Sequence, residues 1–242
     1  MSGVLKGNII IFCLTIFTMG HLQAQNIDLP ARIDLSQYLV PGPNVKPGFG
    51  NPMARIWGWS TTGKVAYSIE RHIDGRGGQI IDFVIFNLIT DEPDLNLKID
   101  TYDLGDNYGS GFESMYNVYK NEILNAMIKY NIVRRETDFL PFPIINNNIK
   151  YNGFITNHEY GLQEYVSKYI TKYTISVATN GRRKIINTFT TNSRLTEEIY
   201  ICGYFLSPYE NRVLIILAEK FLAFEGLELF YRFSGCHLSI GF

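Results

Sequence analysis

The sequence predicts a mainly β protein of the α+β class, with antiparallel sheets and one well-marked helix. Three observations carry this prediction. Residues 64–70, KVAYSIE, alternate apolar and polar side chains, as a half-buried strand does. Asn180-Gly181 separates two alternating segments and marks a type I′ hairpin turn. Apolar residues recur at helical spacing over 111–131, which predicts the helix.

The first 24 residues have the order of a secretory signal peptide. Lys6 precedes an apolar run over 9–19, and Ala24 is the small residue before a cleavage site. Eleven apolar residues make about 16 Å of helix, roughly half of a hydrocarbon core, which disfavours a permanent membrane span. We therefore expect residues 1–24 to be removed and the chain to be periplasmic or extracellular.

The remaining chain has the length of one ordinary domain, because removing 24 of 242 residues leaves 218. Residues 25–55 are rich in Pro and Gly, which disfavour regular helix and central strand, and we expect an extended arm there. Residues 56–242 are expected to form a single mainly β domain. Its elements include a second strand over 79–88, a hairpin over 171–191, a short second helix around 160–170, and strands near 149–156, 198–206, 212–219 and 227–234.

Two distant segments, 57–65 and 203–213, echo one another. Each passes from an aromatic-rich strand through a serine, Ser60 or Ser207, and a polar turn to a cation before the next strand. The second copy is one residue longer between the serine and the cation. This order predicts a strand, a tight turn and a strand, with the serine hydroxyl bonding the turn backbone.

The first copy resembles the blade motif of TolB-type β-propellers, in which a Ser-Pro-Asp-Gly-Lys turn joins two strands. Trp59, Ser60, Gly63 and Lys64 carry the resemblance, and two threonines replace Pro-Asp. The resemblance implies blade-like β units near both ends of one α+β domain. A small β-propeller is the alternative, but it needs four or more blades and the predicted helix interrupts such a series.

On a wider scale, the chain resembles uncharacterised predicted secreted proteins of bacteria, particularly those of spirochaetes. Besides the first turn, the shared features are the segments 74–78, 207–212, 224–226 and 235–242. This resemblance implies export but no particular activity.

Charge excludes some partners. The chain has a formal net charge of −1, and loss of Lys6 with the leader makes it −2. A nearly neutral surface disfavours nucleic acid as a partner and provides no polybasic patch for anionic lipid. No later stretch is long and apolar enough to span a bilayer.

Two of the three cysteines, Cys202 and Cys236, lie beyond the leader. In an oxidising compartment they are a possible disulfide, and two buried thiols in neighbouring strands are the alternative.

The sequence contains no established catalytic template. It has no Gly-x-Ser-x-Gly nucleophile elbow, and His158-Glu159 is not followed by the second histidine of a zincin motif. We therefore predict no metal and no cofactor, and whether the protein is an enzyme stays open, with a non-enzymatic role favoured.

The candidate binding residues are two tryptophans and the charged residues of two loops: Trp57, Trp59, Asp74, Arg76 and Glu225. The leader, the missing catalytic templates and the blade-like segments favour a non-enzymatic module that binds an envelope protein or glycan, and convergence of these five residues would mark its site. One alternative is a hydrolase of cell-wall or polysaccharide substrates that uses two carboxylates, for example Glu70 and Glu225. Another is a structural module without a ligand.

Overall fold

The computed structural model describes residues 28–35, 52–73, 77–104, 111–163, 166–191, 194–223 and 226–242. The predicted signal peptide, 1–24, and most of the predicted arm lie outside them. The described chain is mainly β, with two antiparallel sheets and two helices, which confirms the predicted class. None of its described helices is long and apolar enough to cross a membrane.

The first sheet is an antiparallel meander of five strands in chain order. They are β1 (Ile33–Asp34), β2 (Met53–Trp59), β3 (Lys64–His72), β4 (Gln79–Asn87) and β5 (Glu92–Asp100). The alternation in β3 places its odd-numbered residues on one face and its even-numbered residues on the other. Both faces are buried, because each packs against another layer.

Two helices cover one face of this sheet, α1 (Phe112–Val118) and α2 (Lys120–Lys129). Met115, Tyr116 and Ile123 pack against strand residues such as Phe83 in a helix-side core. The predicted helix over 111–131 is confirmed in place, but it is interrupted at Tyr119, whose φ of −91° and ψ of 13° leave the helical region. The apolar stripe nevertheless continues across the interruption, as the periodicity requires.

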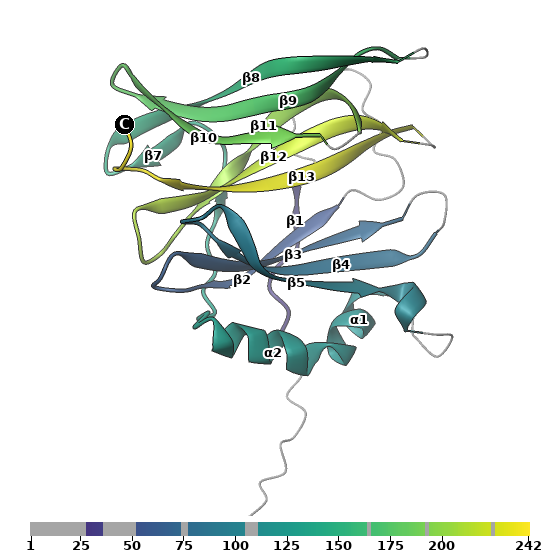
Figure 1. Ribbon diagram of the computed structural model, residues 1–242. Coiled ribbons are helices and arrows are strands. Elements are labelled where there is room, and N and C mark those ends of the chain that lie inside the picture. The colour runs from purple at the N-terminus through teal and green to yellow at the C-terminus, as the bar shows by residue number, and fades with distance from the viewer. Residues whose placement is uncertain are drawn as a thin grey trace, which may run out of the picture.

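The second sheet has eight strands. They are β6 (Phe139–Leu140), β7 (Ile144–Asn146), β8 (Ile149–Gln163), β9 (Val166–Thr179), β10 (Arg182–Thr190), β11 (Leu195–Leu206), β12 (Arg212–Ala223) and β13 (Gly226–His237). Strands β9 and β11 share a single residue pair, Ile170 with Thr196. At this pair the sheet folds back, so that β8–β10 lie over β11–β13 (Figure 1).

The expected short helix around 160–170 is wrong, because this stretch belongs to the hairpin of β8 and β9. Tyr160 is paired with Ile170, and Gly161 with Tyr169. A side chain at Gly161 would collide with the Tyr169 ring, which lies over it. Cross-strand pairing within this hairpin overrides the local preference for helix.

The result is a stack of four layers: helices, five-stranded sheet, β11–β13, and β8–β10 (Figure 1). An inter-sheet core joins the second and third layers, and includes Trp59, Tyr67, Phe205 and Phe233. The stacked rings of Tyr67 and Phe233 lie 4.0 Å apart between their centroids. An outer core joins β11–β13 to β8–β10.

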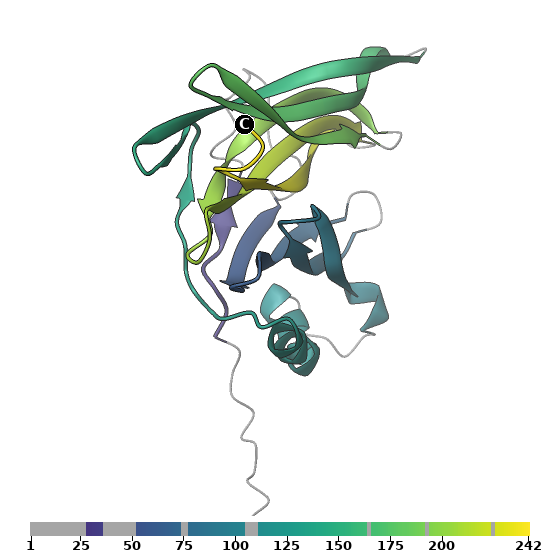
Figure 2. The ribbon, with the colours of Figure 1, turned by 60° about the vertical axis from the view of Figure 1, so that its left-hand side comes forward.

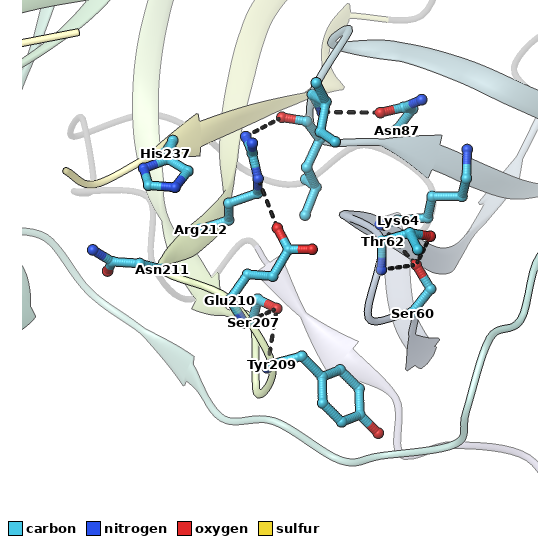
Figure 3. A network of polar contacts seen from close by, with 12 residues as sticks. Ser60, Thr62, Lys64, Asn87, Ser207, Tyr209, Glu210, Asn211, Arg212 and His237 are labelled. Atoms are coloured by element: carbon cyan, nitrogen blue, oxygen red, sulfur yellow. Dashed lines mark hydrogen bonds and ion pairs between the residues drawn. The ribbon is translucent and has the colours of Figure 1, made fainter. Parts of the chain in front are cut away.

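The two echoing segments form matching turns, as predicted. Ser60 Oγ accepts the backbone N–H groups of Thr62 and Lys64, at 3.2 and 3.1 Å. Ser207 Oγ accepts those of Tyr209 and Glu210, both at 3.3 Å. The backbone N–H of each serine donates to the carbonyl of the following cation at 2.9 Å. Figure 3 shows the two turns side by side, and a Cβ at Gly63 in the first turn would lie 3.5 Å from Glu210 Oε2 in the second.

The strands that follow the two turns point their corresponding side chains in the same direction along the stack, and not toward each other. Val65 follows the cation of the first turn and faces the inter-sheet core. Val213 follows the cation of the second turn, but it faces away from the first sheet, into the outer core. The described residues do not form a propeller, because the stack is capped by helices at one end and by β8–β10 at the other.

The β4–β5 turn joins the two sheets. Asp91, at a φ of 61°, accepts hydrogen bonds from Ser234 Oγ, the Gly235 N–H and the Asn187 side chain. A Cβ at Gly235 would lie 2.6 Å from the Leu88 carbonyl oxygen, so the close approach requires glycine.

Candidate functional site

The two candidate tryptophans do not converge, because they lie on opposite faces of β2. A β-bulge makes Trp57 the extra residue between Ile56 and Gly58 in the pairing with β3. Trp57 therefore enters the helix-side core, and its Nε1 donates to Ser68 Oγ at 2.9 Å. Trp59 enters the inter-sheet core, and its Nε1 donates to Thr137 Oγ1 at 3.2 Å. Residues two apart in a regular strand would share a face.

The other three candidates, Asp74, Arg76 and Glu225, lie outside the described residues. The predicted five-residue site is therefore only partly visible. Of its described members, Trp59 and Trp57 are both almost fully buried, and Trp57 lies in the lining of a cleft.

The possible disulfide between Cys202 and Cys236 is wrong, because both are free, buried thiols. Cys202 lies on β11 in the inter-sheet core and Cys236 on β13 in the outer core, with β12 between them. Two strand spacings are about 10 Å, and a disulfide needs Cα atoms within about 7 Å. Burial raises the pKa of Cys202 to about 12 and that of Cys236 to about 11.

The cleft at Trp57 lies on the outer edge of β2. Its volume is about 260 Å³, and it is lined by Asp28, Leu29, Pro30, Ile56, Trp57, Arg134, Arg135 and Glu136. On this edge, β1 pairs with β2 only at Met53 and Ala54, and Val133 pairs only with Trp59. The cleft therefore occupies the part of the edge between these two contacts.

The two walls of the cleft are fixed to each other and to its floor. Arg134 Nη2 donates to the Asp28 carbonyl oxygen, and its guanidinium lies 5.9 Å from the centroid of the Trp57 ring. Figure 2 shows both wall segments, the chain after α2 and the chain leading into β1, running along the same side of the stack. The cleft is thus preformed, with an apolar floor and two carboxylates and two guanidinium groups at its rim.

A buried ion cluster supports the floor. Glu70 is 1% exposed, and its carboxylate accepts hydrogen bonds from Arg32 at 2.7 and 3.0 Å and from Arg55. Arg55 also donates to the Pro30 carbonyl in the cleft wall. Burial, and then the charge of Glu70, raise the pKa of the neighbouring Tyr116. Because two arginines occupy the Glu70 carboxylate, it is unsuited to the acid–base role considered for it above.

The rim continues onto the second Ser-capped turn. The Arg135 guanidinium lies 5.7 Å from the centroid of the Tyr209 ring. Tyr209 belongs to the turn closed by Ser207 (Figure 3). Arg212, at the end of this turn, binds Glu210 at 2.8 Å and the Leu88 carbonyl at 3.2 Å. The cleft therefore opens beside a turn held firmly against the first sheet.

The charged rim residues were not among the residues predicted from the sequence. The only signal was three consecutive charged residues, 134–136, directly after an apolar residue. The sequence gives no sign that Asp28 lies across the cleft from residues 134–136, because Asp28 and Arg134 are 106 residues apart. Within the described part of the chain, no three His, Cys, Asp or Glu side chains gather as metal ligands.

Comparisons with known proteins identify no relative. No protein-family model, no curated protein and no solved structure matches this chain. A function is therefore inferred from the cleft and from the exposed surfaces of the molecule itself.

Proposed function

We propose that this chain is an exported, non-enzymatic binding module of the bacterial cell envelope, and that the cleft at Trp57 receives an extended segment of another envelope protein. The leader-like sequence over 1–24 supports export. The cleft itself, preformed on a strand edge and walled by two tethered segments, is the observation that carries the proposal.

The chemistry of the cleft favours a peptide. Its volume of about 260 Å³ holds one or two side chains rather than a whole small molecule. Half-buried Leu29 and Pro30 offer apolar contact, and the charges of both signs on Asp28, Arg134, Arg135 and Glu136 offer partners for backbone and polar groups. Rim charges of both signs select orientation and partner more than they add affinity.

Site-specific photo-crosslinking tests this function. A photoreactive phenylalanine analogue replaces Glu136 at the rim or, as the control, Lys129 on the exposed face of α2. In exporting bacteria we expect a discrete protein adduct from position 136 that position 129 does not give. Arg134→Glu should abolish this adduct, because it removes the group that ties the wall to Asp28 and Trp57.

Equal adducts from both positions, or an adduct unaffected by Arg134→Glu, would contradict the proposal. An adduct with glycan and not with protein would mean that the cleft binds a glycan instead of a peptide. Turnover of a cell-wall polysaccharide that is lost in Glu136→Gln would favour the hydrolase instead.

A further inference from the structure

The outermost layer, β8–β10 with β7, has a solvent-facing side that the cleft does not involve. The pairing register of these strands shows which residues lie together on this outer face. Ile145 is paired with Lys150, and Phe154 is paired through Ser176 with Ile185. Residues between them, such as Tyr151, point into the outer core instead.

The outer face presents large apolar side chains to solvent. Ile145 is 52%, Phe154 42% and Ile185 68% exposed. They come from three different strands, so they are spread over the face rather than grouped in one loop. Solvated faces of antiparallel sheets are usually polar, so these three side chains give this face apolar contact points for a partner less polar than water.

A cation is fixed among these side chains. Arg183 Nε donates to Ser176 Oγ at 2.7 Å, and its Nη2 donates to Thr156 Oγ1 at 3.2 Å. The guanidinium lies 5.1 Å from the centroid of the Phe154 ring. These contacts hold Arg183 flat across the central strand, where the guanidinium is immobilised at the surface.

Charge is segregated between this layer and the rest of the chain. Residues 149–190 contain six Lys or Arg and two Glu, a net charge of +4, whereas the whole chain is at −1. The nearly neutral total, which argued against a basic patch, therefore hides a basic outer layer on an acidic remainder. On the outer face, the one described carboxylate paired to a cation is Glu159, which binds Lys172 at 2.9 Å.

We propose that the outer face docks on the surface of a bilayer containing anionic phospholipid. Lys150 and Arg183 would contact lipid phosphates, while Ile145, Phe154 and Ile185 enter the headgroup region. A flat surface that combines exposed apolar side chains with cations matches an anionic membrane interface. This docking is independent of the cleft, which lies on the other sheet.

Vesicle sedimentation tests the docking. The chain from Gln25, the expected mature form, is used. We expect binding to vesicles containing phosphatidylglycerol and little binding to phosphatidylcholine alone. Lys150→Ala with Arg183→Ala should weaken binding roughly 25-fold, about fivefold for each cation. Phe154→Ser with Ile185→Ser should weaken it about tenfold by loss of apolar contact.

The matched control is Ile128→Ser with Lys129→Ala on α2, where Ile128 is 74% exposed, and it should bind like the parent. Circular dichroism verifies that each variant is folded. If the cation variant fails to fold, the salt dependence of binding by the unmodified protein tests the role of the cations. High salt must then release the protein from the vesicles.

Three outcomes would overturn the proposal: no binding by the parent, equal loss in the α2 control, or equal binding to both kinds of vesicle. Retention of full binding by the Phe154 and Ile185 variant, together with binding to soluble polyphosphate, would assign the face to a soluble polyanion instead of a bilayer.

Discussion

At the scale of single residues, each sheet contains one buried carboxylate held by two arginines. Glu70 lies between Arg32 and Arg55 in the first sheet. Glu219 lies between Arg194 and Arg232 in the second. The partners come from different strands and segments, so the sequence shows the charges but not the pairing. Such a cluster is costly to break, because loss of the carboxylate leaves two neighbouring arginine charges without their partner.

Glu219→Gln tests this cost. The Glu219 carboxylate is fully buried and also accepts a hydrogen bond from the Tyr173 hydroxyl at 2.9 Å. Replacement by Gln leaves two arginines without their countercharge, and we expect a loss of about 3 kcal/mol in the free energy of unfolding. Denaturant titration measures it. Glu159→Gln, which removes an exposed ion pair, should change stability by less than about 1 kcal/mol. Equal effects would mean that burial of Glu219 is unimportant.

At the scale of elements, local sequence was informative where the local backbone decides the structure. Asn180-Gly181 does form the hairpin turn, with φ values of 48° and 76°. The serine-capped turns also follow from sequence. The bulge at Trp57 could not be predicted, because it depends on Val133, whose carbonyl would lie 2.3 Å from a Cβ at Gly58.

Parallel substitution of the two turn serines tests their equivalence. Ser60→Ala and Ser207→Ala each remove an oxygen that accepts two backbone N–H groups. We expect each to cost about 1 kcal/mol in the free energy of unfolding. Thr61→Ala, on the exposed part of the first turn, is the control and should have little effect. A cost confined to one turn would show that the resemblance between them is only geometric.

At the scale of the whole molecule, the stack buries many groups that ionise at alkaline pH. Burial raises the pKa values of Cys202 and Cys236, and also those of four tyrosines, Tyr67, Tyr116, Tyr173 and Tyr231. The tyrosines and thiols are spread over all three cores, so their titration reports on the stack as a unit.

Stability should therefore fall as pH rises above about 8.5. In the unfolded chain thiols ionise near 8.5 and tyrosines near 10, while the folded chain keeps them protonated. The unfolded state then binds fewer protons, and each such group lowers the free energy of unfolding by about 1.4 kcal/mol per pH unit. Denaturant titrations at several pH values measure the slope. A Cys202→Ala, Cys236→Ala double variant should show a smaller slope below pH 10. A flat profile in the parent would contradict the buried, reduced thiols.

The sequence by itself determined the class of fold, the central helix, the tight turns and the echo between two distant segments. These features depend on side-chain periodicity and on backbone preferences within a few residues. Only the tertiary structure decided that the two tryptophans separate, that the cysteines lie on different faces, and that Asp28 meets Arg134 at the cleft. Those arrangements depend on a bulge, a folded sheet and contacts between segments more than a hundred residues apart, and no local pattern encodes them.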